Sequence, residues 1–134
     1  MYTQETEGVV IRVKPSFRAE ESDPDEGRYI WAYTVEIENT GAQAIQLLER
    51  EWRITDAFNR TEIVRGPGVV GEQPRLQPGE RFSYTSGAPL STPSGFMVGA
   101  YLMERADGVR FDAAVPAFAL DTPFGGPQAS GRVH

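Results

Sequence analysis

The sequence predicts an all-β fold, an antiparallel β-sandwich built as a single domain. Apolar residues recur at every second position in several short runs, which is the period of a strand with one buried face. Turn-forming residues separate these runs, and the chain of 134 residues holds 14 glycines and 10 prolines to supply them. A single core usually organises about 100–200 residues. This length therefore predicts one domain.

The predicted strands follow one another along the chain with the same alternation. The longest run places Tyr29, Trp31, Tyr33, Val35 and Ile37 on one face. The other runs are Val9–Ile11–Val13, Phe82–Tyr84, Phe96–Val98–Ala100–Leu102 and Val109–Phe111–Ala113–Val115. Seven or eight short strands at this spacing are typical of an antiparallel sandwich.

The stretch Ile45–Ile54 fits either a helix or a strand, since its apolar residues match both periods in part. We interpret it as a strand, with a possible bulge, because strands flank it on both sides. Two turns have specific chemistry. Asp107-Gly108 predicts a type I′ hairpin turn, and Pro78-Gly79 predicts a type II turn, in which proline presets φ and glycine takes the positive-φ position.

Composition excludes several classes of chemistry. The chain has no cysteine, so disulfides, thiolate metal sites and cysteine nucleophiles are excluded. Its one histidine is the last residue, His134, and Lys14 is its only lysine. Nineteen acidic residues against thirteen basic ones give a net charge of −6. A negative body repels phosphate backbones, so we expect no nucleic-acid partner.

No targeting or membrane segment is expected. The N-terminal residues MYTQETEG are acidic and polar, unlike a signal peptide. The longest apolar runs, Phe96–Met103 and Ala113–Leu120, are far shorter than the ~20 residues that span a bilayer. We therefore expect a soluble, cytoplasmic protein without a membrane partner.

Two segments look loosely ordered, so the predicted domain covers residues 1–120. Residues 121–134 carry two prolines, three glycines and little to bury, and we expect a flexible tail there. Residues 20–26 hold five acidic side chains around Pro24. Their order does not match an EF-hand, and we predict a solvated loop rather than a metal site.

Four segments in the centre of the chain carry a family resemblance. They read IQLLEREWRITD at 45–56, VRGPGVVGEQP at 64–74, LQPGERFSYTSG at 76–87 and LSTPSGFMVGAYLM at 90–103. In this order and spacing the chain resembles the ApaG family, also called CorD. The resemblance extends from about Val9 to Leu120.

The resemblance implies a fibronectin type III or immunoglobulin-like sandwich. It also implies a genetic link with cobalt and magnesium efflux. Through similar domains in eukaryotic F-box adaptors and a polymerase-δ-interacting protein, the resemblance further implies binding to other proteins. No catalytic activity and no cofactor come with the family. The chain departs from the family pattern at Glu51, where a histidine is expected before Trp52, so any mechanism needing an imidazole there is in doubt.

The segment Gly66–Gly71, GPGVVG, matches the G-x-G-x-x-G dinucleotide pattern. That pattern needs a helix after the loop, and Pro74 stops a helix before two turns. Two interpretations remain open. The loop is either a tight crossing between strands or an anion nest whose N–H groups are assisted by Arg65 and Arg75.

The segment SYTSG, 83–87, contains hydroxyl groups but no neighbouring base. A serine nucleophile needs such a base, so we predict no catalytic residue and no enzyme activity. The aromatic set Tyr29, Trp31, Tyr33, Trp52, Phe82 and Tyr84 is interpreted as core filling.

The sequence therefore predicts a non-enzymatic protein-interaction or accessory module. Its binding loop is expected to comprise Arg65, Gly66, Gly68, Gly71, Glu72 and Arg75, with Tyr84, Ser86 and Gly87 beside it. The partner is an unknown protein, and the module is expected to be a monomer or a weak homodimer. The alternative hypothesis is a small-anion binder that takes a nucleotide or pyrophosphate on the Gly66–Gly71 loop.

Overall fold

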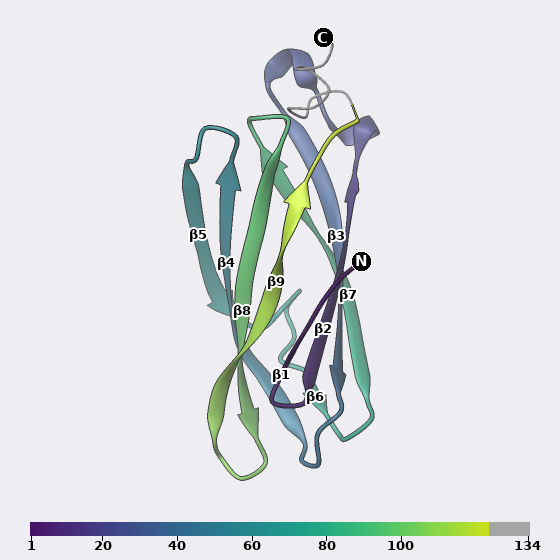
Figure 1. The fold of residues 1–134 in the computed structure, drawn as a ribbon, viewed down its shortest axis with the longest axis vertical. Helices are drawn as coiled ribbons and strands as arrows, with labels where there is room; N and C mark the ends of the chain where they lie inside the picture. Colours follow the sequence, from purple (N-terminus) through teal and green to yellow (C-terminus); the bar gives the residue numbers. More distant parts are fainter. Residues whose placement is uncertain (124–134) are drawn as a thin grey trace.

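Two antiparallel sheets pack face to face in the computed structural model, which describes residues 1–123 (Figure 1). The predicted tail therefore lies outside the described residues from position 124 onward. The strands are β1 Tyr2–Thr6, β2 Val9–Phe17, β3 Tyr29–Asn39, β4 Ile45–Asp56, β5 Thr61–Pro67, β6 Arg75–Leu76, β7 Arg81–Leu90, β8 Gly95–Arg105 and β9 Arg110–Leu120. Two single-turn 3-10 helices, η1 Ala19–Glu21 and η2 Pro24–Glu26, form the acidic loop.

The strand order is β1-β2-β3-β7 in one sheet and β5-β4-β8-β9 in the other, with the short β6 also paired to β4. The predicted all-β sandwich is confirmed. Strand β9 contacts β1 and β2 of the opposite sheet, which closes one side of the sandwich. On the other side, which we call the open side, β5 and β7 are the edge strands. No helix among residues 1–123 is long and apolar enough to cross a membrane.

The core lies between the sheets and is built mainly from alternating positions. In β3, four of the five predicted inward residues, Trp31, Tyr33, Val35 and Ile37, are buried, and Tyr29 is partly buried against the core. Trp52 is also buried, and its ring packs edge-to-face against Tyr33, Tyr101 and Phe118 at centroid distances of 5.3–6.2 Å. Of the six aromatic residues predicted to fill the core, four are buried and two, Tyr29 and Phe82, are partly buried against it. Burial of such rings contributes strongly to stability because each removes a large apolar area from water.

The predicted inward face of β8 is wrong. Met97, Tyr101 and Met103 point into the core, while Phe96 is 45% exposed. Both faces of this strand are apolar, so alternation alone could not choose between them. Gly99 decides the choice, because a Cβ there would lie 2.4 Å from the Glu51 carbonyl oxygen and 2.8 Å from the Trp52 ring. A bulge between Met97 and Gly99 shifts the register with β9.

In β9 the prediction is partly right. Ala113 and Val115 are buried, but Val109 precedes the strand in a turn and is 44% exposed.

The type I′ turn predicted at Asp107-Gly108 is wrong, since only Gly108 has a positive φ, of 88°. The loop is a three-residue hairpin connection in which Gly108 N–H donates to Arg105 O and Arg105 N–H donates to Val109 O. The type II turn at Pro78-Gly79 is confirmed, with φ of 88° at Gly79 and a hydrogen bond from Glu80 N–H to Gln77 O.

The stretch Ile45–Ile54 forms the greater part of β4, as predicted. Its pairing with β8 shifts between Leu47 and Glu49, which places the expected bulge at Leu48. The bulge matters for the site below because it fixes which β4 side chains face inward after it. After the bulge, Arg50 and Trp52 lie on the side of β4 that faces the loop following β5.

Candidate functional site

The loop after β5 folds into a second, very small hairpin. Val69 and Glu72 exchange both backbone hydrogen bonds, at 2.8 and 2.9 Å. The two residues between them, Val70 and Gly71, have φ of 45° and 81°, so the turn is type I′. Val69 is buried and Gly68 N–H donates to Leu48 O at 2.9 Å. The GVVGEQP segment therefore packs against β4, on the open side of the sandwich.

This geometry supports the tight-crossing interpretation of the glycines. A Cβ on Gly68, whose φ is +62°, would lie 2.2 Å from the Glu72 carbonyl oxygen. The N–H groups of Gly68, Val69 and Glu72 already donate within the protein, which leaves them unavailable to an anion. The short strand β6 follows the loop instead of a helix, as expected from Pro74. The dinucleotide-binding arrangement is therefore absent from this loop.

The two arginines expected beside the loop are engaged elsewhere. Arg65 Nε donates to Glu51 Oε1 at 2.9 Å, and Arg75 Nη2 donates to Gln46 Oε1 at 3.0 Å. The Arg65 hydrogen bond, more than the neighbouring Arg53, holds the pKa of the half-buried Glu51 carboxyl below its usual range. Glu72 has an exposed side chain and takes part in the hairpin through its backbone. The loop and its predicted cations are thus not brought together.

Arg50 is the cation that does contact the loop, and sequence reasoning missed it. Its Nη1 donates to the carbonyl oxygens of Pro67 and Gly68 at 3.0 and 2.9 Å. Arg50 pairs with Gly66 across β4 and β5, and a Cβ on Gly66 would lie 3.0 Å from the guanidinium. Gly66 therefore makes room for the arginine. Only the strand register reveals this pairing, although Arg50 stands inside the quoted EREW segment.

A pocket of about 220 Å³ lies beneath the small hairpin. Arg50 and Trp52 of β4, Tyr33 of β3, Tyr84 and Ser86 of β7, and Val69–Gly71 of the loop line it. It therefore joins both sheets to the loop on the open side. Two of the three predicted flanking residues, Tyr84 and Ser86, lie here, whereas Gly87 pairs with Ala32 in the β3–β7 ladder and does not line the pocket.

The phenol groups of the pocket stay protonated at neutral pH. Burial raises the pKa of Tyr33, against a smaller opposing effect of a hydrogen bond with Ser86. Burial likewise raises the pKa of Tyr84 well above the ordinary tyrosine value, and its hydroxyl shares a hydrogen bond with the Tyr101 hydroxyl. These groups therefore offer O–H donors, not charges.

Trp52, which also lines this pocket, carries an unusual hydrogen-bond donor. Its indole Nε1–H is buried and has no hydrogen-bond partner among the described residues. By contrast, the indole of Trp31 donates to the Asp121 carbonyl oxygen at 2.8 Å. Buried polar groups are nearly always paired, and leaving one unpaired costs about 1–3 kcal/mol. Each such group calls for an explanation.

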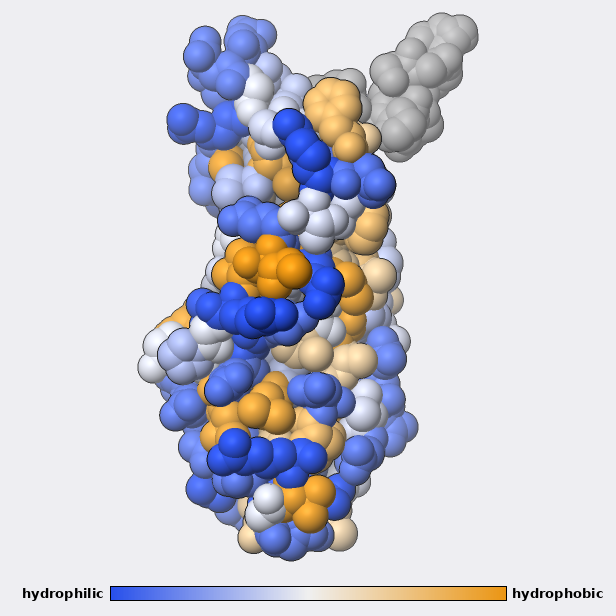
Figure 2. All heavy atoms as spheres, turned by 90° about the vertical axis from the view of Figure 1, so that its left-hand side faces the viewer, coloured by the Kyte–Doolittle hydropathy of each residue, from blue (hydrophilic) through white to orange (hydrophobic). Residues whose placement is uncertain are grey.

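The side of the molecule that carries β5 and the loop combines charges with small apolar patches. Figure 2 shows the side of the molecule on which β5 lies, where hydrophobic patches alternate with strongly hydrophilic residues. Exposed apolar side chains include Phe58 after β4, Ile63 on β5 and Val70 at the hairpin tip. Exposed apolar side chains set among polar residues are compatible with a protein-binding surface.

The remaining residues considered in the sequence do not form a reactive site. The Thr85 hydroxyl of the SYTSG segment pairs with Thr34 across the strands. In the acidic loop, Glu21 is bound by Arg18 at 2.8 Å. Within residues 1–123, no group of three or more acidic, histidine or cysteine side chains is placed to hold a metal ion.

Fold and site together define a small β-sandwich domain, consistent with the fibronectin type III class, with a loop-covered pocket on its open side. The chain belongs to the ApaG family, whose domain model, described as ApaG domain, matches residues 19–105. It is 60% identical over 123 residues to "Protein ApaG" of Maricaulis maris, covering 92% of this chain and 95% of the relative. It is 54% identical to "Protein ApaG" of Rhodospirillum centenum, covering 93% and 96%.

A solved structure supports the same assignment. A crystal structure of the ApaA protein from Bordetella pertussis superimposes with a TM-score of 0.84 at 46% identity, covering 86% of this chain and 94% of that one. The names of these relatives state no catalytic activity. The resemblance inferred from the four central segments is confirmed.

Proposed function

We propose that this chain is a non-enzymatic protein-interaction module whose binding surface is the open side of the sandwich. The observation that carries the proposal is the arrangement of two edge strands, β5 and β7, around the small hairpin of Val69–Glu72. An extended peptide can pair with such an edge through backbone hydrogen bonds. The opposite side is closed by the contact between β1 and β9.

Val70 supports a binding role for the hairpin tip. It is 54% exposed and has a φ of 45°, a conformation that β-branched residues rarely adopt. Glycine or asparagine would occupy this turn position with less strain. Strained, exposed apolar residues of this kind are more common at binding sites than elsewhere, and a partner that covers Val70 would offset the cost.

The link of the family with cobalt and magnesium efflux would then be indirect, through a partner protein. In this proposal the module works in the cytoplasm as a monomer or weak homodimer. The alternative, a nucleotide or pyrophosphate binder, has less support. Three amides of the loop are already used, and Arg65 and Arg75 make their contacts on side chains of β4.

The test combines partner capture with a growth phenotype. In a bacterium that carries this gene, a tagged copy replaces the chromosomal one, and cross-linked partners are quantified. We expect Ile63→Lys on the β5 edge and Val70→Glu at the hairpin tip to lose the same partner, because an edge lysine blocks strand pairing and a buried carboxylate opposes docking. The same variants should reproduce the cobalt and magnesium sensitivity of a deletion strain.

Val109→Lys is the matched control, because Val109 is exposed to a similar degree but lies in the β8–β9 turn. It should behave as wild type in both assays. If neither Ile63→Lys nor Val70→Glu reduces partner capture, this surface is not the binding site. A deletion strain with normal metal tolerance would refute the proposed pathway.

A further inference from the structure

The pocket beneath the small hairpin has the features of an anion-binding site that the proposed function does not yet use. Arg50 is only half exposed, and no carboxylate lies within 4 Å of its guanidinium in the described part of the chain. Its contacts are two backbone carbonyl groups, which carry partial charges only. A partly buried cation without a counter-ion is unfavourable, so the site gains stability when an anion enters.

Neutral donors accompany this cation. The indole Nε1–H of Trp52 has no hydrogen-bond partner among residues 1–123. The hydroxyls of Tyr33 and Ser86 also line the pocket, and the hydrogen bond between them leaves one of the two O–H groups free to donate. In the rest of the pocket, Tyr84 is paired with Tyr101. No acidic side chain lines the pocket. A ligand group that accepts several hydrogen bonds therefore fits, and one that only donates does not.

The charge favours a monoanion over a phosphate. Arg50 is the one basic side chain that lines the pocket. Arg65 and Arg75, which a phosphate dianion would need as additional cations, are bound to Glu51 and Gln46. The chain as a whole has a net charge of −6, which further disfavours a polyanion. A carboxylate accepts a guanidinium and two or three neutral donors with good geometry.

We propose that this pocket binds one carboxylate group of a partner polypeptide, held by Arg50, Trp52 Nε1–H and the one hydroxyl of the Tyr33–Ser86 pair that is free to donate. The inference rests on the proposed protein-interaction function, and it names the chemistry that the partner must present. The volume of about 220 Å³ accommodates a carboxylate with a short side chain, and the walls formed by Val69 and Val70 suit its methylene groups. The carboxylate is a chain terminus or an acidic side chain.

The two indole N–H groups allow a direct test by NMR. The 15N-labelled protein is titrated with acetate, then with N-acetyl-valine, which mimics a chain terminus, and with N-acetyl-aspartate amide, which mimics a side chain. We expect a saturable shift of the Trp52 indole resonance and of the Val70 and Gly71 amides. The Trp31 indole, already paired with Asp121, is the internal control and should not move.

Charge variants assign the response to the pocket. Arg50→Gln should weaken carboxylate binding by about tenfold or more, since a hydrogen bond to a charged group contributes about 1.5–3 kcal/mol. Arg53→Gln is the matched control, because Arg53 lies on the same strand but pairs with Glu51. Trp52→Phe tests the indole donor in the same way. Thermal unfolding of each variant verifies that it is folded.

Three outcomes overturn the proposal: no shift of the Trp52 indole with any carboxylate, equal binding by wild type and Arg50→Gln, or tighter binding of inorganic phosphate than of acetate. The last result would restore the phosphate hypothesis. The proposed function fails separately, through partner capture that ignores Ile63→Lys and Val70→Glu. If the pocket does not bind carboxylates but partner capture is still lost with Ile63→Lys and Val70→Glu, only the present inference is refuted.

Discussion

At the scale of single residues, Gly68 combines two requirements that no other amino acid meets. Its φ of +62° favours glycine, and a Cβ would overlap the Glu72 carbonyl oxygen at 2.2 Å. Gly71 shares only the first requirement, because its φ is +81° and a Cβ there would meet nothing within 4 Å. Substitutions at these two glycines therefore distinguish the cost of a left-handed backbone from the cost of steric overlap.

We predict that Gly68→Ala destabilises the protein more than Gly71→Ala. The left-handed backbone alone costs roughly 1–3 kcal/mol at either position, and the overlap adds to this at Gly68. Urea unfolding of both variants measures the difference. Equal losses would mean that the hairpin shifts to relieve the overlap, which would contradict the close crossing described here.

The buried phenols Tyr84 and Tyr101 form a mutually dependent pair. Each hydroxyl satisfies the other, so Tyr84→Phe leaves Tyr101 without a partner and should cost about 1–3 kcal/mol. Tyr101→Phe should cost a similar amount. We expect the double Phe variant to be less destabilised than the sum of the two, because removing both polar groups leaves neither unsatisfied. A double-mutant cycle by urea unfolding measures this coupling, and strict additivity would contradict the pair.

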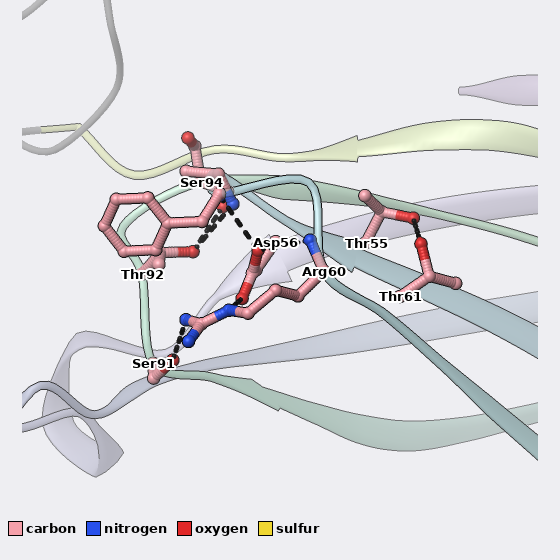
Figure 3. Close-up of polar contacts among 9 residues, drawn as sticks. Thr55, Asp56, Arg60, Thr61, Ser91, Thr92 and Ser94 are labelled. Carbon is pink, nitrogen blue, oxygen red and sulfur yellow. Dashed lines mark hydrogen bonds and ion pairs between the residues drawn. The ribbon is translucent and has the colours of Figure 1, made fainter.

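At the scale of elements, the β4–β5 hairpin is held by one carboxylate. Asp56 Oδ1 accepts the backbone N–H groups of Phe58 and Arg60, and Asp56 Oδ2 accepts Arg60 Nε at 2.7 Å (Figure 3). Thr92 donates to Ser94 O and accepts the N–H of Ala57, which joins this hairpin to the β7–β8 turn. These hydrogen bonds, led by the backbone N–H of Arg60, lower the pKa of Asp56.

The lowered pKa predicts the pH dependence of the hairpin. Folding favours the ionised carboxylate, so its stabilising contribution is complete above the unfolded pKa of about 3.9 and is lost as the pH falls through the lower folded value. Asp56→Asn should therefore be less stable than wild type at pH 7, and the gap should begin to narrow near pH 4 and close only below the folded pKa. Urea midpoints at pH 7 and pH 3 measure this, and a constant gap would contradict it.

Most strands were predictable from the sequence, but the face of β8 that points into the core was not. The alternation in β3 has polar residues on one face, so its buried side was assigned correctly from the sequence. In β8, Phe96, Met97, Val98 and Tyr101 place apolar groups on both faces. The choice of inward face depends on how Gly99 accommodates Trp52 from the neighbouring strand, which is a contact between residues 47 positions apart.

At the scale of the whole molecule, β1 helps to close the sandwich. Its polar sequence gave no strand signal, yet it pairs with β2 along its length and contacts β9 of the opposite sheet. The Tyr2 hydroxyl accepts the N–H of Ala119, the Thr6 hydroxyl accepts that of Ala114, and the Tyr2 ring lies 6.0 Å from that of Phe118. The closed side therefore depends on residues near the N-terminus.

We predict that deletion of residues 1–7 lowers the free energy of unfolding by about 1–3 kcal/mol, because the ladder with β2 and the contacts with β9 are lost. Binding of carboxylates at the opposite, open side should persist in the truncated protein at a temperature where it is folded. Thermal unfolding and the Trp52 indole titration measure the two effects. An unchanged unfolding temperature would show that β1 does not stabilise the closed side.

By itself, the sequence determined the fold class, the burial of β3 and Trp52, the family and the type II turn at Pro78-Gly79, because each rests on local periodicity, turn chemistry or a contiguous segment. Tertiary structure alone decided the composition of the candidate site. It placed Arg50 against Gly66 and directed Arg65 and Arg75 to other partners. It also left the Trp52 indole unpaired beside Tyr33 and Ser86. These facts depend on strand register and sheet packing, which join distant residues.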